Sequence, residues 1–330
     1  MTGRTGGGER VEREGISVRP ATPDDYEAVA SFTQDTWGEG SDYIPRVYQD
    51  WMADQGEGRM TFVADAGDVI AGIAQGVVLS SWEGWGQALR VNPDYRGQGV
   101  SAAITRELFD WVSEQGAVVM RVMVFSWNQA GLGQTRALGY DPTAEFRWLH
   151  PTPDSDGTLE HRVALTADET GRKDPETGVD AAWSFWTASE ACAHLGGLGL
   201  DMDESWALRE VTHRQLERAA RETALFAVTR DDGTKAMAYR SRTFERENEE
   251  GERETWAEYG VGAWADLDAA KALLSSITAD AADVGADRTR ILIPETTRFV
   301  SDGAYLRANI SENPDFVMTV DLTGEDVDTF

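Results

Sequence analysis

Residues 88–101 read Ala-Leu-Arg-Val-Asn-Pro-Asp-Tyr-Arg-Gly-Gln-Gly-Val-Ser, and the rest of the chain is organised around this stretch. An apolar strand pattern stops at Pro93. After two glycines, apolar residues recur every three or four positions from Val100 to Val112, the period of a helix with one buried face. A strand that enters a helix through a glycine-bearing turn leaves the first N–H groups of the helix without partners and directs the positive end of the helix dipole at them. The stretch therefore predicts a turn that binds an anion, typically a phosphate.

The run Arg96-x-x-Gly99-x-Ser101 after this strand resembles the acyl-CoA pyrophosphate loop of the Gcn5-related N-acetyltransferase (GNAT) superfamily, whose pattern is Gln/Arg-x-x-Gly-x-Gly/Ala. Ser101 departs from the last position, but serine is small and its hydroxyl can donate to phosphate. The β-rich run 118–125 and the helix pattern that begins at Asn128 also resemble this family. The alternative is a turn with a purely structural role.

The resemblance implies an α/β (α+β) fold of two tandem GNAT-like domains, each with a mixed, mostly antiparallel central sheet flanked by helices. Residues 15–150 follow the element order β-α-α-β-β-β-α-β-α-β, and the resemblance makes them the catalytic domain. Residues 1–14 are rich in glycine and charge, which predicts a disordered tail. Residues 151–180 are rich in Pro, Gly, Asp and Thr and are predicted to form a linker.

Residues 181–330 are expected to form a second, degenerate copy of the domain. The strand-turn-strand pattern of residues 225–244 parallels that of residues 61–79, which indicates an internal repeat. Where the first copy has the phosphate loop, the second has Asp266 and Asp268, whose charges would repel a pyrophosphate at a helix start. We therefore expect the second copy to keep the fold without the cofactor.

Amide formation from a thioester needs a neutral amine, a donor for the oxyanion and a proton for the leaving thiolate. The resemblance implies that acetyl-CoA is the acyl donor and that Asn128 contacts it. It further implies that the backbone of Leu89, Arg90 and Val91 binds the pantetheine arm and polarises the thioester carbonyl. The residues implied to hold the pyrophosphate are Arg96, Gly97, Gln98, Gly99, Val100 and Ser101.

The catalytic base and acid are less clearly marked in the sequence. Thr135 stands where the family often has a tyrosine as thiolate acid, so that role is vacant or has moved. Glu83 is a candidate base, acting directly or through water, and the alternative for it is a solvated hairpin carboxylate. The four histidines lack the spacing of metal ligands or of a catalytic triad, so no metal is expected.

The acceptor pocket is expected near Trp37 and Tyr43, because the corresponding segment walls the acceptor in this superfamily. The run Asp42-Tyr43-Ile44-Pro45 with Trp51, together with residues 86–100, is similar to histidine N-acetyltransferase-like proteins, which are also tandem. That similarity implies a free amino acid or small amine as acceptor. The alternative is that Tyr43 and Trp51 only pack helices.

Composition limits the partners and the compartment. The net charge of −28 is spread over both halves, which favours adaptation to high salt (a halophilic protein) over a local surface for basic substrates. Nucleic acid is a poor partner for so acidic a chain. The one cysteine, Cys192, allows no intrachain disulfide, and no apolar run suggests a membrane span or signal core, so we expect a cytoplasmic protein.

These features together predict an acetyl-CoA-dependent N-acetyltransferase that acts on a primary amine of a small molecule. Direct transfer in a ternary complex is expected, because the sequence offers no nucleophilic Cys or Ser constellation. The second copy completes the acceptor pocket or a homodimer. Two alternatives stay open, a non-catalytic acyl-CoA sensor, suggested by Thr135, and a scaffold protein in which the glycine turn is only structural.

Overall fold

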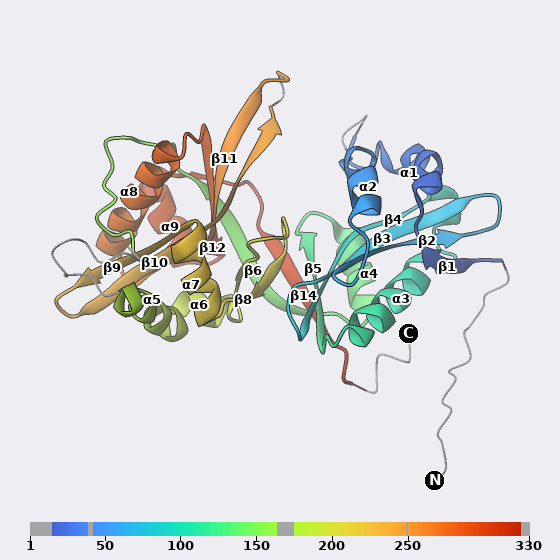
Figure 1. The fold of residues 1–330 in the computed structure, drawn as a ribbon, viewed down its shortest axis with the longest axis horizontal. Coiled ribbons are helices and arrows are strands. Elements are labelled where there is room, and N and C mark those ends of the chain that lie inside the picture. The colour runs from blue at the N-terminus through green and yellow to red at the C-terminus, as the bar shows by residue number, and fades with distance from the viewer. Residues whose placement is uncertain (1–14, 39–41, 164–174, 249, 325–330) are drawn as a thin grey trace, which may run out of the picture. The chain divides into compact units, whose positions relative to one another are not determined.

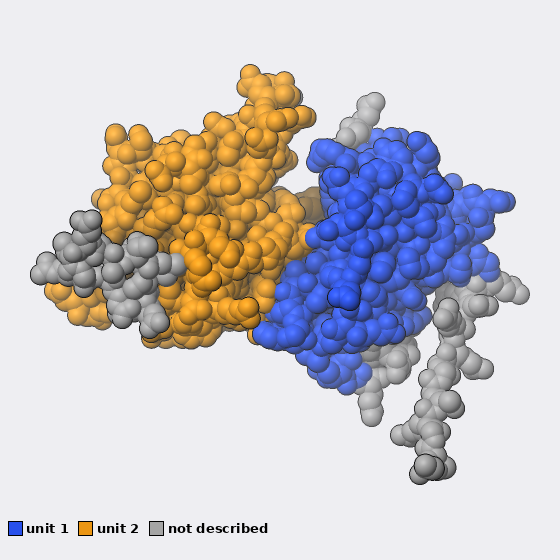
Figure 2. All heavy atoms as spheres, viewed as in Figure 1, with its two compact units in different colours: residues 1–121, 320–330 blue, residues 122–319 orange. Residues whose placement is uncertain are grey.

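The computed structural model describes residues 15–38, 42–163, 175–248 and 250–324. The chain divides into two compact units, residues 1–121 with 320–330 and residues 122–319 (Figure 2). The predicted tail, residues 1–14, lies outside the described residues, as does part of the predicted linker.

The first unit is built on an antiparallel sheet with helices on both sides (Figure 1). Its strands, in spatial order, are β1 (Ser17–Pro20), β2 (Arg59–Asp65), β3 (Ile70–Val78) and β4 (Glu83–Val91). Its helices are α1 (Tyr26–Thr33), α2 (Ile44–Ala53) and α3 (Val100–Glu114), with 3-10 turns at Pro23–Asp25 and Pro93–Tyr95.

Side chains of β2 alternate between the two faces of this sheet, as the period of a strand requires. Phe62 packs edge-on against Trp111 of α3, with ring centroids 6.5 Å apart. Val63, the next residue, joins a buried cluster that includes Val29 of α1 and Tyr48 of α2. Helix α3 therefore covers one face, and α1 and α2 cover the other.

Glycines in β3 let α3 lie close to the sheet. A Cβ atom at Gly72 would stand 2.8 Å from Cγ1 of Val100, and one at Gly76 would stand 3.0 Å from the ring of Trp111. The first distance is shorter than real Cβ atoms show and the second is tighter than most Cβ contacts, so larger residues would push the helix away. Gly72 and Gly76 thus allow α3 to pack directly on β3, with Val100, the first residue of the helix, against Gly72.

The second unit contains a larger mixed sheet, in the strand order β5-β14-β6-β12-β11-β10-β9. Strand β11 pairs with β12 in parallel, whereas β10 pairs antiparallel with β9 and β11, and β6 does so with β12 and β14. Its strands are β5 (Val119–Phe125, which begins in the first unit), β6 (Asp141–His150), β9 (Ala224–Arg230), β10 (Gly233–Glu247), β11 (Arg253–Trp264), β12 (Arg288–Pro294), β13 (Asn309–Ile310) and β14 (Asp315–Asp321), with β7 (Leu198–Leu200) and β8 (Leu208–Glu210) paired separately. Its helices are α4 (Gln129–Ala137), α5 (Pro175–Ala188), α6 (Glu190–His194), α7 (His213–Glu222), α8 (Leu267–Asp283) and α9 (Thr297–Tyr305).

The element order confirms the α/β class and the β-α-α-β-β-β-α-β-α-β succession expected for residues 15–150. The domain bounds 15–150 and 181–330 stay a prediction, and the two compact units are a different division of the chain. The division falls after Arg121, inside β5, and residues 320–330 belong to the first unit. The reason is that strands pair by register and not by chain order: β14, from the end of the chain, lies beside β6 in the second unit.

A buried arginine organises the second unit. The guanidinium carbon of Arg290 in β12 lies 4.7 Å from the ring centroid of Trp148 and 4.5 Å from that of Trp206. The guanidinium carbon also lies 4.9 Å from the ring centroid of Phe244, and the guanidinium contacts the fully buried carboxylate of Glu258. Aromatic faces attract cations, and a buried charge needs a counter-charge. This cluster therefore ties β6, β10, β11 and β12 together.

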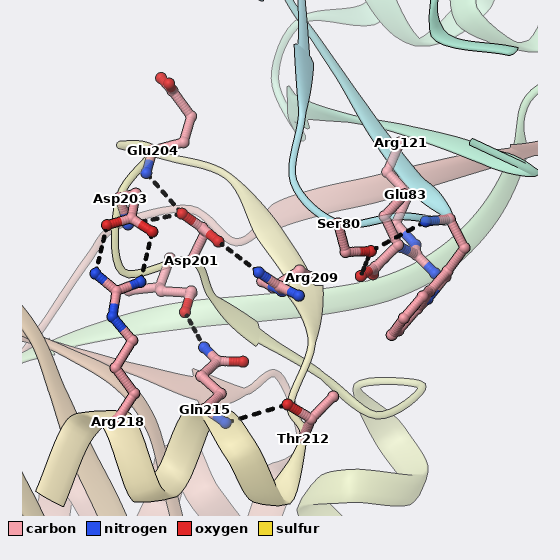
Figure 3. Close-up of polar contacts among 12 residues, drawn as sticks. Ser80, Glu83, Arg121, Asp201, Asp203, Glu204, Arg209, Thr212, Gln215 and Arg218 are labelled. Carbon is pink, nitrogen blue, oxygen red and sulfur yellow. Dashed lines mark hydrogen bonds and ion pairs between the residues drawn. The ribbon is translucent and has the colours of Figure 1, made fainter. Parts of the chain in front are cut away.

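The turn that leads to Trp206 is held by Asp201. Its Oδ1 accepts hydrogen bonds from the backbone N–H groups of Asp203 (2.7 Å) and Glu204 (2.6 Å), as Figure 3 shows. Trp206 itself has a φ of 62°, which bulky residues rarely adopt. The turn and the contact with Arg290 together hold the indole in this conformation.

Asp315 in β14 is expected to make the free energy of unfolding depend on pH. Its side chain is buried, accepts a hydrogen bond from Trp148 Nε1 (3.1 Å), and burial raises its pKa to about 6. An acid whose pKa is higher in the folded state takes up a proton on folding, so its contribution to stability is present at low pH and is lost as the pH rises through about 6. We expect Asp315→Asn to raise the free energy of unfolding above pH 7 by up to about 3 kcal/mol, because asparagine keeps an acceptor for Trp148 without the charge.

Urea unfolding of both proteins from pH 4 to pH 8 measures this difference. The gain should shrink towards pH 4, where the native carboxyl is also neutral. A gain that does not change with pH would contradict the assignment.

Candidate functional site

The turn between β4 and α3 has the conformation that its sequence predicts. The side chain of Asn92 accepts a hydrogen bond from Asp94 N–H (3.2 Å) and opens a short 3-10 turn. Gly97 and Gly99 then have φ values of 74° and 82°, in the left-handed region that favours glycine. The chain can therefore reverse sharply at this point and bring its backbone close to a ligand.

The first turn of α3 presents backbone donors. Gly99 is the residue before the helix and has no side chain to cap it. The first bond within the helix runs from Ala103 N–H to Gly99 C=O (3.0 Å), so the N–H groups of Val100, Ser101 and Ala102 precede the intrahelical ladder. These donors, the helix dipole and the exposed Arg96 suit a phosphate group.

Strand β4 is distorted immediately before this turn. Arg90 lies opposite Ile73 of β3, but Gln87 lies opposite Gln75, so Ala88 and Leu89 share one position of the partner strand. This is a β-bulge, and Ala88 has a φ of 60°. A bulge leaves its extra residue outside the ladder, which frees backbone groups near Leu89 to meet a ligand.

The segment between α1 and α2 is tied to this bulge by an ion pair. Arg90 Nε donates to Asp42 Oδ2 at 2.8 Å, and the Asp42 side chain is fully buried. The guanidinium carbon lies 4.9 Å from the ring centroid of Trp37 and 5.9 Å from that of Tyr43. The structure thus brings Trp37, Tyr43 and Arg90, which the sequence predicts as site residues, together within the first unit.

Glu83, the predicted base, lies at the start of β4 and is fully buried. Its Oε1 accepts a hydrogen bond from Arg121 Nη1 (2.6 Å) and its Oε2 accepts one from Ser80 Oγ (2.8 Å), as Figure 3 shows. The alternative of a solvated hairpin carboxylate is therefore wrong. The role of Glu83 as a base stays a prediction.

Glu83→Gln separates the structural part of this residue from a catalytic one. Glutamine keeps the shape but removes the counter-charge of the buried Arg121, so we expect the free energy of unfolding to fall by about 2–3 kcal/mol. Urea unfolding measures this, with Asp54→Asn as control, because Asp54 is exposed and its pair with Arg59 is long (3.5 Å). An unchanged kcat in the folded E83Q protein would contradict the base role.

Asn128 and Thr135, the remaining predicted positions, lie in the second unit. Asn128 caps α4, since its side chain accepts a hydrogen bond from Gly131 N–H (3.0 Å). The hydroxyl of Thr135 donates to Gly131 C=O (2.7 Å) inside the same helix. Nearby Tyr140 is buried, and burial raises the pKa of its phenol well above the ordinary range. The thiolate acid therefore remains unassigned.

The start of α8, which the sequence predicts to correspond to the turn before α3, has a different structure. The residue before α8 is Asp266, whose carboxylate accepts a hydrogen bond from Ala269 N–H (2.8 Å). Both of its oxygens also accept from Arg230, at 2.9 and 3.0 Å. The N-terminus of α8 is thus capped by the protein's own anion.

Sequence reasoning missed three residues of this region. Arg121 and Ser80 hold Glu83, and Asp42 holds Arg90 across 48 positions of the chain. A local signal existed for Asp42 alone, because Asp side chains often accept from the backbone N–H two residues on, and its Oδ1 does accept from Ile44 N–H (2.9 Å). Long-range pairings leave no such signal.

Two further observations concern metal ligands and membrane spans in the described part of the chain. None of its groups of His, Cys, Asp and Glu has three members placed to hold a metal ion. No helix within the described ranges combines the length and the apolar composition that crossing a bilayer requires.

Comparison with known proteins supports the motif. Residues 26–140 match the sequence profile of the Acetyltransferase (GNAT) family. A histidine N-acetyltransferase of Oreochromis niloticus is 30% identical over 98 residues, which cover 30% of this chain and 28% of that protein. A thialysine N-epsilon-acetyltransferase of Bos taurus is 28% identical over 74 residues, which cover 22% of this chain and 44% of that protein. The chain spans less than half the length of these curated relatives.

A solved structure resembles the whole chain. The crystal structure of a GCN5-related N-acetyltransferase from Sphaerobacter thermophilus matches with a TM-score of 0.57 and 14% identity, covering 94% of this chain and 96% of that one. At this identity the likeness concerns the fold, and it confirms the predicted fold class.

Proposed function

We propose that this protein, whose residues 26–140 match the sequence profile of the Acetyltransferase (GNAT) family, is an acetyl-CoA-dependent N-acetyltransferase that acts on a primary amine of a small, amino-acid-like molecule. The observation that carries the proposal is the turn at residues 96–101, where two left-handed glycines lead into a helix start with open backbone donors. The curated relatives with similar segments are named for acetylation of histidine and of thialysine.

Each part of the first unit has a role in this reaction. The N–H groups of Gly97, Gly99, Val100 and Ser101, with the Arg96 side chain, hold the pyrophosphate of acetyl-CoA. The bulge at Leu89 presents backbone groups to the pantetheine arm and the thioester carbonyl. The amine nitrogen attacks the carbonyl carbon, the C–N bond forms, the C–S bond breaks, and the proton lost by the amine balances the one gained by the thiolate. Transfer is direct, within a ternary complex.

The proposal assigns the chemistry to residues 15–150 and a supporting role to residues 181–330. The carboxylate of Asp266 supports this division, because it occupies the helix N-terminus where a pyrophosphate would bind. We place the acceptor pocket of this reaction in the first copy. Trp37 and Tyr43 form one wall of that pocket, and their planar rings suit an amine with a flat or cationic part.

A sensor that binds acetyl-CoA without turnover is the second candidate. One observation favours it: the Thr135 hydroxyl, at the position of the usual acid, is buried and donates to a carbonyl of its own helix. Such a hydroxyl is not placed to protonate a leaving thiolate.

Thiol release from acetyl-CoA tests the proposal, with a panel of amino acids, polyamines and a lysine peptide as acceptors. The assay is run at molar salt, because the charge of −28 supports adaptation to a salty cytoplasm. Release that depends on one class of small amine supports the enzyme. Binding of acetyl-CoA without release points to the sensor, and absence of binding overturns both.

A further inference from the structure

Arg90 makes two contacts that join separate parts of the first unit. Its Nε donates to Asp42 Oδ2 (2.8 Å), between α1 and α2, and its Nη1 donates to the carbonyl of Leu89 (3.2 Å), within the bulge of β4. The side chain is only 13% exposed. One rigid guanidinium fork therefore links the bulge to the segment that carries the aromatic wall.

Asp42 extends this link to both neighbouring helices. Its Oδ1 accepts from Ile44 N–H (2.9 Å) at the start of α2, and its own N–H donates to Gln34 C=O (3.1 Å) at the end of α1. Its side chain is fully buried, so its charge depends on Arg90 for compensation. A change at Arg90 is thus felt at the ends of both helices.

The two residues of the aromatic wall, Trp37 and Tyr43, both border the same guanidinium, at 4.9 and 5.9 Å. We propose that Arg90 is a positioning residue, whose side chain sets the aromatic wall against the thioester-binding bulge. This role rests on the proposed function. It is distinct from the contact that the backbone of Arg90 is expected to make with the cofactor, because it acts on the acceptor.

Substitution by lysine tests the role. Arg90→Lys keeps a positive charge beside Asp42, but a lysine ammonium cannot bridge Asp42 and Leu89 with a planar fork or stack on Trp37. We expect R90K to retain the melting temperature within a few degrees and the Kd for acetyl-CoA within about twofold, while kcat/KM for the amine falls by about 10- to 100-fold. Arg90→Ala should lose stability as well as activity.

Asp42→Asn is the second variant, and it keeps the fork but removes the buried charge. The double variant R90K/D42N should have the same kcat/KM as the less active of the two single variants, because both substitutions break the same contact. Arg19→Lys is the matched control, because Arg19 also bridges two acidic groups of this unit, Asp25 and Asp65, and should leave the acceptor kinetics unchanged.

Two results overturn the role. If the R90K protein retains the wild-type kcat/KM for the amine, the positive charge of residue 90 is sufficient. If the losses of kcat/KM in the double variant are additive, Arg90 and Asp42 act separately. Wild-type protein that binds acetyl-CoA but acetylates no amine overturns the proposed function and this role with it. The two failures are therefore distinguishable.

Discussion

Gly99→Val is expected to weaken acetyl-CoA binding by at least about 100-fold, which corresponds to the loss of two charged hydrogen bonds. Gly99 has a φ of 82°, and a β-branched residue there must leave the left-handed region. The first turn of α3 would then shift and no longer point its N–H groups at the pyrophosphate. Isothermal titration with acetyl-CoA measures the change.

The matched control for this variant is Gly116→Val. Gly116 also has a positive φ (97°), and a Cβ there meets only the Ser81 carbonyl at 3.4 Å. It follows the other end of the same helix, about 26 Å from Gly99 at 1.5 Å per residue. The substitution there therefore adds similar backbone strain without touching the loop. Equal affinity of folded G99V and wild-type protein would contradict the phosphate loop and with it the enzyme proposal.

Arg290→Met is expected to lower the free energy of unfolding by about 3–5 kcal/mol. The variant removes one of the positive charges that compensate the fully buried carboxylate of Glu258. Arg242 Nε (2.8 Å) and Ser241 Oγ (3.0 Å) still donate to that carboxylate. It also removes the cation that the rings of Trp148 and Trp206 surround. Urea unfolding at constant salt measures the loss.

Arg288→Met is the control for this effect. Arg288 lies two residues earlier on the same strand, its side chain is 60% exposed, and it pairs with Glu254 at 3.2 Å. An exposed pair contributes about 0–1 kcal/mol, so R288M should be close to wild type. Similar losses in both variants would show that the burial of Arg290 is not what matters.

The elements closest to the loop were predictable because their signals are local. Two glycines, a strand pattern and a helix pattern stand within residues 88–112, and the left-handed φ values of Gly97 and Gly99 follow from that order. The sequence also places the charge of Asp266 at a helix start, and the structure shows that its carboxylate caps that helix. For the same reason the element order of residues 15–150 was expected correctly.

The extent of the units was not predictable in this way. Composition places a linker at residues 151–180, but the units divide after Arg121. Strand β14 lies beside β6 although about half of the chain separates them, because backbone pairing depends on register and not on chain order. Composition indicates which segments lack regular secondary structure, but it does not indicate which strands pair.

The sequence by itself therefore determined the family motif, the order of the elements and the difference between the two helix starts. Each of these features depends on residues that are close together in the sequence. The tertiary structure alone decided that Glu83 pairs with Arg121, 38 positions away, and that Arg90 pairs with Asp42, 48 positions away. Periodicity shows which face of an element is buried. Periodicity does not show which charged side chain lies on the facing element, and the identity of that partner sets the chemistry of the site.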